Sequence, residues 1–144
     1  MEPLTFLWVL LGITALATGA QAWSCARRAT VMRRVAKGWG MTYVHCDRFR
    51  LAARIAPLLT PSGGENVTVS DVMYQTINGR RRYLFTVDFA EGQAASQRTR
   101  RCVAAVDEVV VGVGEKEKPI ALHLGGEGAG GAEGYEKLRG ELAL

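Results

Sequence analysis

The sequence is poor in the side chains on which most catalytic and metal sites depend. Its 144 residues include two histidines and three cysteines. The cysteines, Cys25, Cys46 and Cys102, form no CxxC pair and are odd in number, whereas a secreted disulfide scaffold needs an even set at close spacing. The pattern therefore predicts reduced thiols in a cytoplasmic domain, and the absence of CxxCH excludes covalently attached haem.

The few candidate ligands and carboxylates are badly spaced for chemistry. His45, Cys46 and Asp47 are consecutive, so on an extended chain at most His45 and Asp47 point to the same side, and a metal needs three or four ligands. Asp71 and Asp88 are candidates to face each other across a hairpin, but solvated strand positions explain them better. We therefore expect no catalytic residue, metal, cofactor or small-molecule substrate, although an enzyme whose site another subunit completes stays open.

Acidic residues are missing from a long N-terminal stretch, because no Asp or Glu lies between Glu2 and Asp47. The positive charges of this stretch are Arg27, Arg28, Arg33, Arg34 and Lys37. The net charge of +4 is thus concentrated beside an apolar segment and does not cover a whole surface. This distribution argues against nucleic acid as a partner.

The apolar segment covers residues 4–23, carries no charge and reads LTFLWVLLGITALATGAQAW. A helix rises about 1.5 Å per residue, so this stretch covers the ~30 Å hydrocarbon core of a bilayer. Trp8 and Trp23 lie near its two ends, where indole rings favour the membrane interface. The sequence therefore predicts a transmembrane anchor over residues 1–25.

A cleaved signal peptide is the alternative for this segment, since Ala20-Gln21-Ala22 matches the small-x-small cleavage pattern. The residues before the apolar run include Glu2 and no Lys or Arg, however, and the arginines follow the run. This charge order favours an uncleaved single-pass anchor in the cell inner (cytoplasmic) membrane. The N-terminus would then lie outside and the C-terminal domain in the cytoplasm.

The anchor also offers a surface for another helix. Gly12, Ala15 and Gly19 lie on one helical face and form a stripe of small residues. Such a stripe lets the backbones of two membrane helices approach closely. We therefore treat these three residues as candidates for helix packing against other membrane proteins.

A basic juxtamembrane helix is predicted directly after the anchor, over residues 26–38. The segment contains no helix breaker before Gly38 and Gly40. We expect its arginines to contact anionic lipid headgroups, at about 1 kcal/mol each. These headgroup candidates are Arg27, Arg28, Arg33 and Arg34.

Residues 39–113 are predicted to form a small α+β cytoplasmic domain, an antiparallel β-meander with one packed helix. Asp47 is a suitable N-cap for a helix that Pro57 limits to about two and a half turns. Strands over residues 67–77 and 80–91 are joined by Asn78-Gly79, the preferred type I′ turn. A phase slip in the first strand near Ser70-Asp71 predicts a bulge or an edge position.

The second strand of this hairpin alternates clearly. Its aromatic face carries Tyr83, Phe85, Val87 and Phe89, and we expect the domain helix to pack there. A third strand over residues 98–113 completes the predicted meander. A short strand or extended entry is expected near residues 41–44.

The remaining residues, 114–144, are predicted to form a Gly-rich, partly flexible tail. Within the tail, IALHL at residues 120–124 is a candidate short strand. Residues 132–144 are a candidate amphipathic helix of marginal stability.

Basic residues also gather on two predicted strands. Arg80 and Arg82 share one face at the hairpin, and Arg98 and Arg100 share one face of the next strand. A solvated edge that discourages aggregation, a contact with anionic lipid and a docking patch for an acidic partner all account for these arginines. We treat the four residues as candidates for partner docking.

Several short motifs of the chain resemble those of a group of small bacterial single-pass membrane proteins. The motifs are Trp39-Gly40-Met41-Thr42-Tyr43, Asp47-Arg48-Phe49-Arg50-Leu51 and Gly79-Arg80-Arg81-Arg82-Tyr83-Leu84-Phe85, with Asp88-Phe89 and Gly92. That group likewise places a helical anchor before a domain with the pattern WG-x-x-Y, D-x-F-x-L and R-Y-x-F-x-x-D/E-F/Y. The resemblance covers roughly residues 4–107 and implies an architecture without implying a mechanism.

These features predict a non-enzymatic, membrane-anchored accessory or interaction protein. Its helix would pack on other membrane helices, and its small domain would dock on a partner near the cytoplasmic surface. The alternative is an anionic-lipid-binding sensor or scaffold at the membrane surface. The expected partners are thus the lipid bilayer and other membrane proteins.

Overall fold

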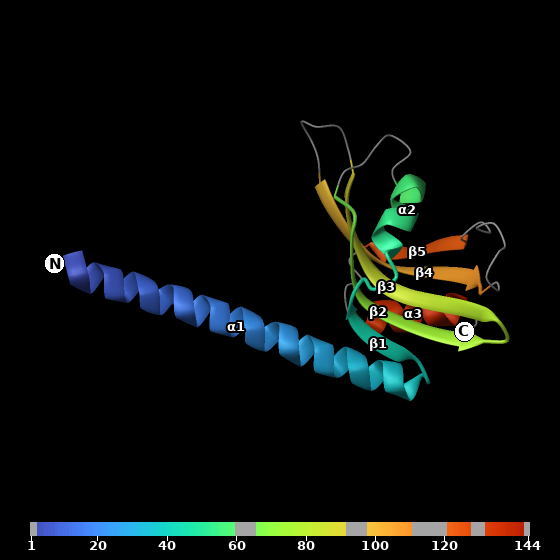
Figure 1. Ribbon diagram of the computed structural model, residues 1–144, viewed down its shortest axis with the longest axis horizontal. Helices are drawn as coiled ribbons and strands as arrows, with labels where there is room; N and C mark the ends of the chain where they lie inside the picture. Colours follow the sequence, from blue (N-terminus) through green and yellow to red (C-terminus); the bar gives the residue numbers. More distant parts are fainter. Residues whose placement is uncertain (1–2, 60–65, 92–97, 111–120, 128–131, 143–144) are drawn as a thin grey trace.

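The structure, a computed structural model, describes residues 3–59, 66–91, 98–110, 121–127 and 132–142 (Figure 1). A single antiparallel sheet has the strand order β1-β2-β3-β4-β5, so neighbouring strands follow one another along the chain. The strands are β1 (Thr42–Cys46), β2 (Thr68–Ile77), β3 (Arg80–Glu91), β4 (Arg98–Val109) and β5 (Ala121–Glu127). The helices are α1 (Pro3–Gly38), α2 (Leu51–Leu59) and α3 (Ala132–Glu141).

Helix α1 is continuous from the apolar segment through the basic segment, so the two predicted regions form a single helix. With 36 residues it is about 54 Å long, and it extends well beyond the sheet (Figure 1). The hydroxyls of Thr14 and Thr18 bond carbonyls one turn back, to Leu10 and Thr14 among others, which satisfies them within an apolar helix. One helix of the described chain, α1, is long and apolar enough to cross a membrane.

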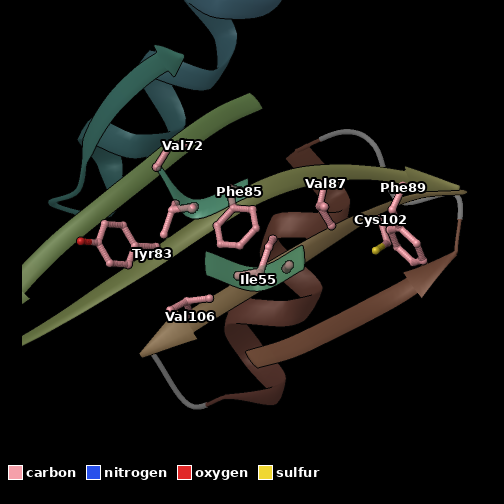
Figure 2. Packing of buried hydrophobic residues seen from close by; sticks show 10 residues of the cluster. Ile55, Val72, Tyr83, Phe85, Val87, Phe89, Cys102 and Val106 are labelled. Atoms are coloured by element: carbon pink, nitrogen blue, oxygen red, sulfur yellow. The ribbon is translucent and has the colours of Figure 1, made fainter. Parts of the chain in front are cut away.

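The β2–β3 hairpin and its helix confirm the predictions made from local pattern. Asn78 and Gly79 have φ of 51° and 73°, the left-handed backbone that a type I′ turn requires at both positions. The aromatic face of β3 is buried against α2, and Figure 2 shows Ile55 of α2 lying against Phe85. Asp47 caps α2, because its carboxylate accepts hydrogen bonds from the backbone N–H groups of Leu51 and Ala52.

The sheet is an antiparallel meander as predicted, but it has five strands and not three, because the candidate strands near residues 41–44 and 120–124 form β1 and β5 at its two edges. Strand β5 pairs with β4, and the register of this pairing shifts between Cys102 and Ala104. A Cβ atom at Gly125 would lie 3.0 Å from the carbonyl oxygen of Val103, so a glycine permits this close pairing. The predicted tail therefore supplies an edge strand, and residues 111–120 and 128–131 lie outside the described chain.

The sheet is covered by helices on both faces. Helix α2 covers one face, and the last three turns of α1 together with α3 cover the other (Figure 1). On this second face Met32 and Ala36 of α1 share a buried cluster with Met73 of β2 and with Tyr135 and Leu138 of α3. The domain is therefore a three-layer α/β/α arrangement from the last turns of α1 onward, of which the sequence pattern predicts only the layer formed by α2.

Candidate functional site at the junction of helix α1 and the sheet

The alternation of side chains between the two faces of β2 shifts by one residue where the strand lies against α1. Val67 and Val69 pack toward α2, and so do Val72 and Tyr74, so an extra residue lies between the two pairs. The ladder with β3 shifts its register between Ser70 and Met73 at the same place. Of the two features that the phase slip predicts, a bulge or an edge position, the structure contains the bulge.

Asp71 occupies this bulge and combines a left-handed backbone with a buried carboxylate. Its backbone has a φ of 53°, a left-handed conformation that Asp tolerates better than most residues. Its side chain is turned toward α1, and the residue is only 3% exposed. The expectation that Asp71 is a solvated strand residue is therefore wrong, because the bulge rotates its carboxylate into the interface between α1 and the sheet.

The buried carboxylate of Asp71 is held by groups from two other elements. Its Oδ2 accepts a charge-assisted hydrogen bond from Nε of Arg28 in α1, at 2.9 Å. Its Oδ1 accepts a hydrogen bond of 2.7 Å from the hydroxyl of Tyr43 in β1, and Nδ1 of His45 lies 3.5 Å away. These contacts compensate for burying a charge, which is costly unless the charge is paired and hydrogen-bonded.

The backbone of Asp71 is fixed from α3. The Tyr135 hydroxyl donates to the carbonyl oxygen of Asp71 at 3.0 Å. Because that bond uses the single proton of the phenol, the Thr86 hydroxyl, 2.8 Å away, is the donor in the second contact of Tyr135. Asp71 in the β2 bulge thereby contacts α1, β1 and α3, and Tyr135 extends the network to Thr86 of β3.

Burial changes the acidity of the phenols in this network. Desolvation and the hydrogen bond to Asp71 raise the pKa of Tyr43, and the negative charge of Asp71 acts in the same direction. Desolvation also raises the pKa of Tyr135, which is the more deeply buried of the two. Both phenols are therefore neutral hydrogen-bond donors at neutral pH, which suits a positioning role and excludes a phenolate nucleophile there.

We expect the protein to lose stability above about pH 10. A phenol whose pKa is raised on folding keeps its proton in the native state while the unfolded chain, with a pKa near 10, releases it. The stabilisation is complete below that pH and falls as the pH rises, at about 1.4 kcal/mol per pH unit for Tyr135. Urea unfolding between pH 8 and about pH 11 would measure this slope.

The Tyr135→Phe variant is the control for this pH dependence. It should have a shallower slope than the wild type over the same range, because one of the shifted phenols is gone. An identical slope in both proteins would show that Tyr135 does not contribute to the linkage.

A second ion pair lies next to the network on the same face. The Asp88 carboxylate binds the Arg101 guanidinium through two hydrogen bonds of 2.6 and 2.8 Å.

At the other end of this face a cavity of about 210 Å³ is lined in part by Arg82, Asp107 and His123. Arg82 and Asp107 are paired at 3.3 Å, and the described lining contains no serine, threonine or cysteine that could act as a nucleophile.

The residues predicted for membrane contacts lie along α1. Gly12 and Gly19 are exposed on the helix, and a Cβ atom at either would meet nothing within 4 Å. Arg27, Arg33 and Arg34 are also exposed. Arg28 differs from the other three arginines, because its guanidinium binds Asp71 and its side chain is 38% exposed. No local pattern in the sequence indicates this difference between Arg28 and the other arginines.

The four arginines predicted for partner docking are separated by the structure. Arg80 is paired in the ladder with Val109 and Arg98 with Glu91, at opposite ends of the β3–β4 ladder. Arg82 binds Asp107, and Arg100 binds Glu91 at 3.1 Å. The two pairs of arginines therefore form two separate surfaces.

The described residues offer no group of three or more His, Cys, Asp or Glu side chains that could hold a metal ion. Within the described chain Cys25, Cys46 and Cys102 form no disulfide, and Cys102 is buried among apolar side chains. His45 points to Asp71 and Tyr43, while Asp47 caps α2, so these two residues do not converge.

Sequence reasoning missed the two residues at the centre of this junction. The sequence pattern predicts a solvated Asp71, and Tyr135 lies in the segment predicted to be a partly flexible tail. The one available signal is the phase slip at Ser70-Asp71, since a bulge changes the direction in which a side chain points.

Comparisons of the chain with protein-family models, curated proteins and solved structures give no match.

Proposed function

We propose that the chain is a single-pass membrane protein and a non-enzymatic accessory or interaction subunit. In this proposal α1 crosses the cytoplasmic membrane with its N-terminus outside. The sheet domain then lies at the cytoplasmic surface and docks on a partner, while α1 packs against other membrane helices.

The exposure of the apolar half of α1 is the observation that carries the proposal. Residues 4–23 hold no charged side chain, and none of the apolar window of α1 is buried in the chain itself. Leu4, Leu16 and Trp23 are 65%, 76% and 75% exposed. A continuous apolar surface of this size requires a bilayer or a protein partner to cover it.

The attachment of α1 to the sheet supports a positioning role for the helix. Met32 and Ala36 are part of the core, and Arg28 is paired with the buried Asp71. The domain is therefore joined to α1 by packing and by a specific ion pair, with no flexible linker between them. Such an arrangement suits a subunit that holds its domain in a defined orientation at the membrane.

The Gly12→Leu/Gly19→Leu variant is expected to lose its membrane-helix partners. Leucine side chains at these positions would separate the backbones of closely packed helices. Tagged full-length protein would be purified from its own membranes in mild detergent, and the co-purifying proteins quantified by mass spectrometry. We expect recovery of membrane proteins to drop by roughly tenfold, which corresponds to a loss of about 1.4 kcal/mol of packing free energy.

Ala17→Leu is the matched control, because Ala17 lies on the opposite face of α1 at 100° per residue. It should leave recovery unchanged, and equal losses in both variants would contradict a specific packing face. The intact mass of the purified protein tests retention of α1, since a signal sequence has the same character. A mass of 15.6 kDa supports an anchor, and the mass of residues 23–144 would refute it.

A further inference from the structure

The two arginine surfaces of the β3–β4 ladder lie at different distances from the apolar half of α1. Arg28 contacts Asp71, whereas Met32 and Ala36, further along α1, share a cluster with Met73. The direction from Met73 to Asp71 along β2 is therefore also the direction toward the N-terminus of α1. Strand β2 continues in that direction to Thr68.

Strands β3 and β4 reach further than β2 in this direction, toward the N-terminus of α1. Thr68 pairs with Asp88, and β3 then runs on to Glu91, which pairs with Arg98. From Asp71 to Glu91 this path covers six residue steps of strand, about 20 Å. Figure 1 shows this end of β3 and β4 leaning back toward the N-terminal half of α1.

The membrane interface predicted at Trp23 is close to this end of the sheet. Trp23 precedes Arg28 by five residues, which is about 7.5 Å along the helix. A component of about 7.5 Å parallel to α1, out of this strand path of about 20 Å, brings the end of the sheet level with Trp23. Arg80, at the other end of β3, lies about 36 Å from Glu91 along the strand, several times the screening length of ~8 Å at physiological salt.

The charge of this end fits an anionic surface. Arg98, Arg100 and Arg101 lie there with Asp88 and Glu91, which leaves a net charge of +1. Asp88 is bound by Arg101, and Glu91 by Arg100. Arg98 is exposed and forms no ion pair with another described residue, so its charge is available.

We propose that the end of the sheet formed by Asp88–Glu91 and Arg98–Arg101 rests on the anionic headgroups of the bilayer that α1 crosses, with Arg98 as the main contact. This proposal rests on the proposed function, because it requires α1 to span the membrane. The opposite end, with Arg80, faces away from the membrane and is left for a protein partner. The domain thus has a lipid-facing end and a partner-facing end.

Spin-label depth measurements on the full-length chain test this orientation. Cys25 and Cys46 are replaced by serine, the buried Cys102 is kept, and single labels are placed by Leu10→Cys, Thr99→Cys or Ile77→Cys. The protein is reconstituted in vesicles of phosphatidylcholine with phosphatidylserine. Collision with oxygen, which partitions into the bilayer, is compared with collision with a water-soluble nickel chelate.

We expect the oxygen-to-nickel ratio to be highest at Leu10, intermediate at Thr99 and lowest at Ile77, with several-fold steps. Arg98→Glu should lower the ratio at Thr99 toward that at Ile77, and so should vesicles of phosphatidylcholine alone. Arg80→Glu is the matched charge reversal at the far end and should leave the Thr99 label unchanged.

Each other outcome contradicts either the lipid-facing end, the headgroup contact or the spanning helix. A membrane-embedded Leu10 with equal ratios at Thr99 and Ile77 would overturn the lipid-facing end and leave the spanning helix intact. A water-accessible Leu10 would overturn the proposed function, and the orientation with it. A Thr99 label that is insensitive to Arg98→Glu and to lipid charge would overturn the headgroup contact.

Discussion

Replacing Tyr135 with alanine is expected to lower the free energy of unfolding by about 3–5 kcal/mol, the range for removing a large buried ring. Tyr135 is fully buried between α3 and the sheet, in a cluster with Met73 and Leu138. The substitution leaves a cavity there. It also removes the donor to the Asp71 carbonyl and the acceptor of the Thr86 hydroxyl, both of them buried.

Two further substitutions separate the packing of Tyr135 from its hydrogen bonds. Tyr135→Phe keeps the ring and should cost about 1–2 kcal/mol, for the polar groups left unpaired. Glu136→Ala, at the exposed neighbouring position of α3, should change stability by less than about 0.5 kcal/mol. Urea unfolding in mild detergent, followed by near-UV circular dichroism, measures all three. If Tyr135→Ala were as mild as Glu136→Ala, α3 would not be docked on the sheet.

Replacing Asp71 with alanine is expected to lower the free energy of unfolding by about 2–4 kcal/mol, because it removes one partner of a charged, largely buried hydrogen-bond network. The change removes the partner of Arg28 and the acceptor of the Tyr43 hydroxyl. It also places alanine at a φ of 53°, which costs about 1–2 kcal/mol. This expected loss of stability is smaller than the loss for breaking a fully buried ion pair, because the Arg28 side chain is 38% exposed and partly hydrated.

Asp71→Asn isolates the charge, since asparagine tolerates the left-handed backbone and keeps the shape of the side chain. We expect it to cost about 1–2 kcal/mol. A double-mutant cycle with Arg28→Gln should give a coupling of about 1 kcal/mol or more. The same cycle on the exposed pair of Glu91 and Arg100 is the control, with an expected coupling below about 1 kcal/mol. Equal couplings in the two cycles would show that the Arg28–Asp71 pair has no special part in joining α1 to the sheet.

Local physics explains why much of the architecture was predictable. The apolar run of residues 4–23, the Asn78-Gly79 turn and the alternation of β3 each depend on residues that are neighbours in the chain. Hydrophobic period, backbone preference and helix rise act over such short distances. The cap at Asp47 and the bulge at Ser70-Asp71 belong to the same class.

The sequence by itself thus determined α1, the β2–β3 hairpin and the layer formed by α2. Only the tertiary structure decided that β5 and α3 complete the domain, that Asp71 is buried, and that Arg80 and Arg98 belong to different surfaces. These features depend on contacts between distant residues, such as the 64 positions between Asp71 and Tyr135. A glycine-rich strand and a weakly amphipathic helix gain their stability from the surface on which they pack. The environment of a buried carboxylate is likewise set by the elements around it, which no local pattern encodes.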